Sequence, residues 1–411
     1  MRPKSWREIC REIRREIAGR RRIDRRLSGE ISEKLDRLKK LFILEVVGGE
    51  LDRARGWSSE LKKTLELVKG DLKLDEIVFP RELGSFLGDP EAHLRKKLFI
   101  YAMDLARRRM SIKAFEERGR RAVQTSLQTN LRNIYQSWVF LTILRQVSAN
   151  GFLIYPEHGY LSLERSGRQR LSSIPPNAVV DAGGGLLSFF LEAPRPIAWE
   201  DTEDLRRVWR LYKAMRPDIL VYGGKVLDIF AEELDPPIKR PDAIIECKEL
   251  EDWYRRVREL RADDKPISAE EWRWMWLRGL WTGLGRELGA RVKPKEVEAG
   301  SGRRIRLKEQ ELVKIYARLY KPKEMILVSR CRTPADVRRD LEAEGIEVFD
   351  DVRFDPEKLK EVSKRLLEYA TPSEDIIVLR GELARMIKRM SRALRRSPEE
   401  LIREAVEAIG S

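Results

Sequence analysis

Apolar residues recur at three- and four-residue steps along the first third of the chain, and this spacing predicts amphipathic helices. The first helical region covers residues 1 to about 45 and ends at the glycine pair 48–49. A longer helix is predicted from Ile112 to Val147. Its later part, residues 134–144, is apolar on nearly every side, so we expect it to be buried. Residues 1–114 are therefore interpreted as a basic, helical amino-terminal region.

The pattern changes at Gly151, where short extended segments separated by Gly, Pro, Asn and Ser replace the helical periodicity. Residues 219–222 and 242–250 are predicted to be apolar strands, and residues 325–349 a strand–helix–strand unit. Such alternation is typical of an α/β sheet. We therefore predict an α/β domain over residues 115–370. Two further helices are predicted inside it, at residues 202–215 and 269–288.

The composition leaves few residue types for catalysis. The chain of 411 residues has 83 Lys and Arg and 68 Asp and Glu, but only two His and three Cys. Two imidazoles exclude a multi-histidine metal centre, and the scattered cysteines form neither a disulfide framework nor a CxxC zinc motif. An enzyme built from this chain must therefore use carboxylates, Lys, Arg, Tyr or Ser.

The formal net charge of +15 favours an acidic partner, nucleic acid first and an anionic membrane surface second. No apolar run approaches the ~20 residues of a membrane span, and the first residues lack a signal-peptide core. We therefore expect a cytoplasmic protein with no membrane partner. Arg, Glu and Lys abound while Asn and Gln are scarce, as in thermophiles, whose surface charges also serve stability. The basic amino-terminal helices are thus either a phosphate-contacting arm or an ordinary packed pair.

Charged residues interrupt the apolar strands at two places. Glu246 and Lys248 project from the same face of one strand, because strand side chains alternate, and Asp218 opens a strand that could lie beside it. Burying such charges is costly unless they pair or hold a metal. Two carboxylates and backbone oxygens suit Mg²⁺ or Mn²⁺, which prefer oxygen ligands. We predict a metal site at Asp218, Glu246 and Cys247, with the Cys247 thiol packed into the core.

Such a site can cleave a phosphodiester bond without histidine. The ion polarises the phosphodiester and lowers the pKa of a bound water, while Lys248 orients that water or stabilises the developing charge. Asp242 is the alternative to Asp218, since it lies on the same strand face as Glu246. Four residues span about 13 Å along a strand, however, which is too far to share one ion. Asp218 is therefore the preferred ligand.

At these residues the chain resembles the PD-(D/E)xK nuclease superfamily, in which a Pro-Asp opens one strand and an acidic-x-Lys motif follows on the next. The matching residues here are Pro217-Asp218 and Glu246-Cys247-Lys248. The resemblance implies that Asp218 and Glu246 bind the metal and that Lys248 assists the attacking water. It also implies a PD-(D/E)xK (restriction-endonuclease-like) α/β core and a Mg²⁺- or Mn²⁺-dependent endonuclease.

The long predicted helix adds to this resemblance. Its segment Ile134–Trp138, followed by Gly151, is similar to the helix that precedes the core of McrC-type nucleases, the cutting subunits of modification-dependent restriction systems. Gln136 stands where that family commonly carries a glutamate. We include Gln136 in the candidate catalytic site, whose third acidic ligand is then missing or supplied from elsewhere.

Residues 371–411 form a third segment. A short strand is predicted at 375–380, then a helix with an apolar stripe, and a second helix opens at Ser397-Pro398 with the capping-box acid Glu400. This order resembles a ribbon-helix-helix module, an obligate dimer whose paired strands lie in the DNA major groove. The strand offers few polar side chains for reading bases. The module therefore either dimerises without specific reading, or its strand joins the sheet instead.

These observations lead to one preferred hypothesis and two alternatives. The preferred one is a homodimeric, divalent-metal-dependent nuclease that hydrolyses phosphodiester bonds in DNA, with RNA as the alternative substrate. The first alternative is a non-catalytic DNA-binding or regulatory protein with a decayed nuclease fold. The second is a helical scaffold with a highly charged surface. Metal-dependent cleavage distinguishes the nuclease from the non-catalytic DNA-binding protein. Salt-dependent DNA affinity distinguishes both of them from the helical scaffold.

Overall fold

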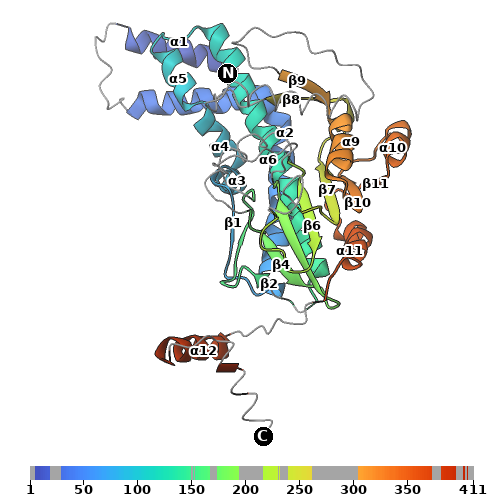
Figure 1. Cartoon of the computed structure of the whole chain (residues 1–411). Coiled ribbons are helices and arrows are strands. Elements are labelled where there is room, and N and C mark those ends of the chain that lie inside the picture. Colours follow the sequence, from blue (N-terminus) through green and yellow to red (C-terminus); the bar gives the residue numbers. More distant parts are fainter. Residues whose placement is uncertain are drawn as a thin grey trace, which may run out of the picture. The chain divides into compact units, whose positions relative to one another are not determined.

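The computed structural model shows two compact units, Met1–Thr371 and Pro372–Ser411. The residues that it describes are 5–18, 29–149, 153–166, 174–193, 216–229, 239–261, 304–372 and 381–394, together with Gly151, Ala231, Leu401, Ile402 and Ala405. The first unit is a mixed α/β fold with a helical amino-terminal region, as predicted (Figure 1). Within the described part of the chain, no helix combines the length and the apolar character needed to cross a membrane.

In the described residues before the sheet, six helices are present. They are α1 (Trp6–Ile17), α2 (Gly29–Asp71), α3 (Arg81–Gly88), α4 (Pro90–Lys97), α5 (Phe99–Ala106) and α6 (Ile112–Val147). The predicted bounds of α6 are confirmed, as is the burial of residues 134–144. Near the predicted helix end at glycines 48–49, α2 is kinked: Val47 has non-helical angles (φ −139°, ψ 18°), and a second helical stretch continues from there to Asp71. The predicted break is therefore present as a kink one residue earlier, and the chain does not leave the helix there.

An aromatic cluster holds the amino-terminal helices together. The ring of Trp6 on α1 lies 5.2 Å from Phe42 on α2 and 5.4 Å from Phe115 on α6, between ring centroids. Ser5 and Glu8 form a reciprocal capping box that fixes the start of α1. The described part of the basic amino terminus is therefore a packed helix, and the contact of its arginines with phosphate stays a prediction.

The sheet has seven strands in the order β11-β10-β7-β6-β5-β4-β2. Their bounds are β2 (Leu153–Tyr155), β4 (Ala178–Asp181), β5 (Leu186–Leu191), β6 (Ile219–Gly223), β7 (Ala243–Lys248), β10 (Glu324–Ser329) and β11 (Ile346–Phe349). Strands β7, β10 and β11 run parallel, and every other neighbouring pair is antiparallel. Every residue of β5 and β7 is buried, as expected for strands covered on both faces.

Helices cover both faces of this sheet (Figure 1). On one face, α6 and α11 (Lys360–Leu367) share a hydrophobic core with alternate residues of β7, including Ile245 and Cys247. On the other face, α9 (Glu309–Tyr320) and α10 (Ala335–Glu342) pack against Ile244 and its neighbours. The first core also contains the residues of α1 to α5, so residues 1–114 and 115–370 are not separate packing units.

Two small ribbons complete the first unit. β1 (Glu76–Val78) pairs with β3 (Tyr160–Ser162), and β8 (Val257–Arg261) pairs with β9 (Arg304–Lys308). Short 3₁₀ turns occur at η1 (Trp253–Arg255) and η2 (Pro356–Leu359). The helices predicted at 202–215 and 269–288 lie outside the described residues.

The second unit contains α12 (Gly381–Leu394), where the sequence predicts the first helix of the carboxy-terminal module. Leu401, Ile402 and Ala405 are also helical, inside the second predicted helix. The strand predicted at 375–380 falls outside the described part of the chain, so a ribbon-helix-helix arrangement stays a prediction.

Candidate active site

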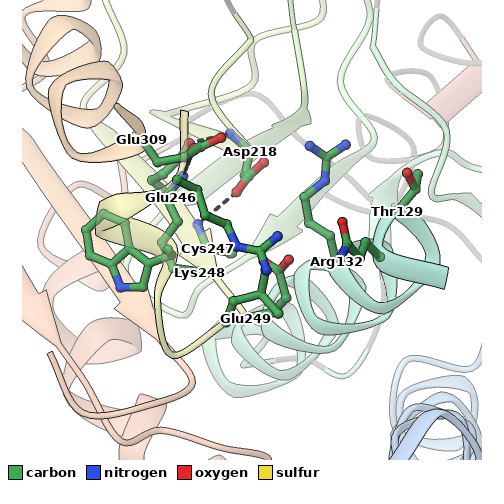
Figure 2. A pocket seen from close by; sticks show the side chains of 12 residues that line it. Thr129, Arg132, Asp218, Glu246, Cys247, Lys248, Glu249 and Glu309 are labelled. Atoms are coloured by element: carbon green, nitrogen blue, oxygen red, sulfur yellow. Dashed lines mark hydrogen bonds and ion pairs between the residues drawn. The ribbon is translucent and has the colours of Figure 1, made fainter. Parts of the chain in front are cut away.

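The register of two antiparallel strands brings Asp218 beside Glu246. Ile219 at the start of β6 pairs with Ile245 of β7, so the residue before β6 lies opposite the residue after Ile245. The backbone N–H of Asp218 donates to Glu246 Oε2 at 3.2 Å. The backbone N–H of Cys247 donates in turn to Asp218 Oδ2 at 2.8 Å. The two carboxylates predicted from the sequence are thus held together by the edges of two strands (Figure 2).

Lys248 projects from the same face as Glu246, as the alternation of strand side chains predicts. Its Nζ donates to Glu246 Oε1 at 3.0 Å and to Glu309 Oε2 at 2.6 Å. Glu309 is the first residue of α9 and was not predicted as part of the site. It is 61 residues from Lys248 in the sequence, and no motif or spacing connects the two. The Lys248 ammonium also lies 5.7 Å from the centre of the Trp253 ring.

These groups line a cavity of about 200 Å³. The sheet supplies Asp218, Glu246, Cys247 and Lys248, the segment after β7 supplies Glu249, Leu250, Trp253 and Arg256, α9 supplies Glu309, and α6 supplies Gln128, Thr129 and Arg132. Figure 2 shows Arg132 and Thr129 extending from α6 and Glu309 from α9, with Asp218 and Glu246 between them in this view. Four carboxylates, one lysine and two arginines therefore share a small space.

The environment shifts the pKa values of the two central groups. Burial raises the pKa of Glu246 to about 7, and the charge of Asp218 adds to this, while Lys248 acts in the opposite direction. Burial alone would lower the pKa of Lys248, but the carboxylates of Glu246, Glu309 and Asp218 more than offset it and raise that pKa. Lys248 is therefore protonated at neutral pH and acts as a hydrogen-bond donor.

Two of the other residues considered in the sequence lie outside the cavity. Gln136 is buried in α6, and its amide Nε2 donates to the backbone oxygen of Asp218 at 3.3 Å. Gln136 thus holds the backbone of Asp218 through this hydrogen bond from α6. Asp242 lies at the other end of β7, where it accepts from the N–H of Gly223 at 2.7 Å and pairs with Lys323 at 2.7 Å. The structure therefore places Asp218 beside Glu246, and not Asp242.

Cys247 takes part through its backbone only. Its side chain belongs to the core under α6, as predicted. Burial, with the nearby charges of Asp218 and Glu246, raises the pKa of its thiol well above the ordinary value, so the free thiol is protonated at neutral pH. Its N–H points at Asp218. In a strand the C=O of a residue points to the same edge as its N–H, so the carbonyl of Cys247 faces that side too.

The donor set fits a hard divalent cation. Within the described ranges, no group of three or more His, Cys, Asp or Glu side chains is arranged to hold a metal. Mg²⁺ does not require such a group, since it commonly takes one or two carboxylates and completes its shell with waters and phosphate oxygens. Asp218 and Glu246 supply two carboxylates, and the raised pKa of Glu246 reflects a buried pair of like charges that a cation would relieve.

Comparison with known proteins identifies no relative. No model of a protein family matches the chain, and no curated protein or solved structure is significantly similar to it. The chemistry of the site is therefore inferred from its own geometry.

Proposed function

We propose that the chain is a divalent-metal-dependent nuclease that hydrolyses phosphodiester bonds in DNA. The observation that carries the proposal is the meeting of Asp218, Glu246 and Lys248 in one cavity. Lys248 pairs with Glu246 and Glu309, but Asp218 and Glu246 still place two buried carboxylates side by side, an arrangement that a bound cation would stabilise. Structural ion-pair networks also exist, but perturbed pKa values inside a cavity are characteristic of functional sites.

The surrounding elements support a PD-(D/E)xK core. Pro217-Asp218 opens β6, and Glu246-Cys247-Lys248 ends the neighbouring strand β7, in the order that the superfamily pattern requires. The strand–helix–strand unit predicted at 325–349 is formed by β10, α10 and β11, and continues the same sheet.

Each residue of the site has a distinct task in this proposal. The carboxylates of Asp218 and Glu246 and the carbonyl of Cys247 would hold Mg²⁺ or Mn²⁺. When bound, the ion would polarise the phosphodiester and make a water nucleophilic at neutral pH. Lys248, protonated and held by Glu309, donates to the attacking water or to the oxygens that gain charge. Gln136 fixes the backbone of Asp218 and is a positioning residue.

The test is cleavage of labelled single- and double-stranded DNA by the purified chain. We expect cleavage with Mg²⁺ or Mn²⁺ and none in the presence of a chelator. The alternative, a non-catalytic DNA-binding protein, is favoured by the glutamine at position 136, where McrC-type nucleases commonly carry an acid. DNA binding without cleavage under any of these ions would support that alternative and reject the nuclease.

We also propose that the second unit makes the protein a homodimer. Three apolar side chains of α12 are largely exposed in the single chain, Met386 (45%), Met390 (43%) and Leu394 (55%). A row of this kind needs a partner surface. The full chain should therefore be a dimer, and a chain ending at Thr371, where the first unit ends, should be a monomer. Light scattering gives the solution mass, and an equal number of subunits in both forms would contradict the proposal.

A further inference from the structure

Helix α6 differs in composition from the rest of the chain. Six of the ten Asn and Gln residues in the protein lie within it. After Glu117 it contains no acidic residue, although Asp and Glu make up 68 of the 411 residues. Most of the chain is rich in both acidic and basic residues. The later part of α6, by contrast, combines arginines with neutral amides and has no acids.

The amides and arginines form a row that ends at the cavity. Positions three and four apart lie on one helix face, and the row consists of Arg121, Gln124, Thr125, Gln128, Thr129 and Arg132. The first five are exposed, and Gln128, Thr129 and Arg132 also line the cavity. None of the six side chains forms a hydrogen bond or an ion pair with any other residue that the structure describes.

The exposed faces of other helices behave differently. On α2, neighbouring exposed charges neutralise one another through pairs at three-residue spacing. These pairs are Arg53–Glu50, Arg55–Asp52 and Lys63–Glu60. The row on α6 has no such pairs among the described residues, so its donors remain available to water or to a ligand within this part of the structure.

Arg132 provides an independent indication of a ligand. Its Nε is buried and has no hydrogen-bond partner among the described residues, as is also true of the Nε atoms of Arg95 and Arg365. The charge of Arg132 acts on the Glu249 carboxylate, which also lines the cavity. Buried donors are normally paired, because an unsatisfied one loses its hydration without compensation. Figure 2 shows this side chain beside the cavity that holds Asp218 and Glu246. An anionic group entering the cavity would supply the missing acceptor.

We propose that this row on α6 binds the phosphate backbone of nucleic acid and that Arg132 holds a phosphate next to the bond to be cleaved. The statement about the bond to be cleaved rests on the proposed function. Amides, hydroxyls and guanidinium groups are the usual donors to phosphate oxygens, and an acid-free surface avoids repulsion. The eleven helical steps from Arg121 to Arg132 span about 16 Å, or about five base-pair steps of duplex DNA.

Binding to a labelled oligonucleotide, single-stranded and duplex, tests the row without reference to cleavage. The assay is done with a chelator and repeated with Ca²⁺, over a range of salt concentrations. The variant Gln124→Glu/Gln128→Glu places two negative charges in the row while keeping side-chain shape. We expect it to weaken binding by about tenfold or more, because like charges juxtaposed at an interface are strongly unfavourable. The matched control is Ser32→Glu/Ser59→Glu, two exposed positions on α2 that change the net charge equally.

The salt dependence provides a second measurement. Arg121→Ala/Arg132→Ala should reduce the slope of log affinity against log salt by between about one and two, since each lost phosphate contact contributes about 0.7 to 0.9. The control Arg37→Ala, an exposed arginine of α2, should leave the slope unchanged. Wild-type protein that does not bind, or row variants that lose no more affinity than the α2 controls, would overturn the inference.

The outcomes also separate this inference from the proposed function. Row-dependent binding without cleavage would keep the nucleic-acid surface and reject the nuclease. If the row variants cleave and bind DNA as the wild type does, the nuclease proposal is kept and the nucleic-acid surface on α6 is rejected.

Discussion

Replacing Lys248 with methionine is expected to lower Mg²⁺-dependent DNA cleavage by about 10³-fold. Methionine keeps the approximate length of the side chain but removes the ammonium that contacts Glu246 and Glu309 at 3.0 and 2.6 Å. The attacking water, or the oxygens that gain charge, then lose their donor in a small, largely buried cavity. The measurement is the single-turnover rate of cleavage of labelled DNA with excess protein.

A second buried lysine provides the matched control. Lys314 lies on α9, is almost as buried as Lys248 and pairs with Asp340 at 2.6 Å, but it does not line the cavity. Lys314→Met should therefore cost stability through the loss of an ion pair and leave the cleavage rate near that of the wild type. Retained cleavage in Lys248→Met, or a loss in both variants that follows their thermal stability, would show that Lys248 has no catalytic role.

The stability of Lys248→Met is itself informative. Removing one partner of a buried ion pair commonly costs about 3–5 kcal/mol, because the other charge is left without compensation. Glu246 reduces this cost, since its carboxyl already has a pKa of about 7 and takes up a proton more readily when the ammonium is gone. The variant should therefore fold, and thermal unfolding checks this before any rate is compared.

The second large effect concerns Glu246, whose pKa makes the stability of the metal-free protein depend on pH. The folded-state pKa of about 7 lies above the ordinary value of 4.5, so the folded protein binds the proton more tightly than the unfolded chain. The contribution of Glu246 to stability is then fully present below pH 4.5 and is lost as the pH rises to about 7. The fall from this group is about 3 kcal/mol, at 1.36 kcal/mol per pKa unit. Urea unfolding across this pH window, with a chelator present, measures it.

Glu246→Gln should show a smaller fall over the same window, because glutamine does not titrate. Burial also raises the pKa of Glu249, so a part of the slope remains in both proteins. Lys248 does not contribute there, since it is protonated in both the folded and the unfolded chain below pH 7. Equal slopes for wild type and variant would mean that Glu246 is already ionised and compensated in the metal-free protein.

Added Mg²⁺ should offset the repulsion and lost hydration of the buried carboxylates of Asp218 and Glu246. It should therefore raise the melting temperature of the wild type at neutral pH. A ligand that binds only the folded state at 100 times its Kd stabilises by about 2.7 kcal/mol. Glu246→Gln should lose this response. Glu249→Gln should keep it, since Glu249 lines the same cavity without a place in the metal site. If Glu249→Gln alone loses the response to Mg²⁺, the metal is bound by Glu249 and not by Glu246.

The sequence predicted the elements that local patterns determine. The bounds of α6 follow from an unbroken apolar periodicity, and Ser111 caps its first turn by accepting from the N–H of Ala114. The pairing of Asp218 with Glu246 was also predictable, since each belongs to an apolar strand and the strands are consecutive among those the sequence shows. Strand alternation then placed Lys248 on the face of Glu246 without further information.

What the sequence could not show depends on how helices pack onto the sheet. Glu309 reaches Lys248 because α9 packs across the face of β7, and nothing near Glu309 in the sequence marks it. Arg132 resembles any other surface arginine until its buried, unpaired Nε is seen beside the cavity. Gln136 was assigned to the site from its resemblance to a family position, but the helix turns its amide toward the backbone of Asp218.

The continuity of α6 has a consequence for how this protein could be divided. With 36 residues it is about 54 Å long, and one helix carries Phe115 in the amino-terminal aromatic cluster and Arg132 in the cavity wall. A fragment that starts near residue 115 would keep every residue of the cavity. It would lose the amino-terminal helices that pack against the first turns of α6, and so expose apolar side chains there. The sheet and its cavity are therefore not a unit that can be separated from the amino-terminal helices. Trp6 and Phe42, remote from the carboxylates, pack against Phe115 at the start of the same helix whose later turns line the cavity.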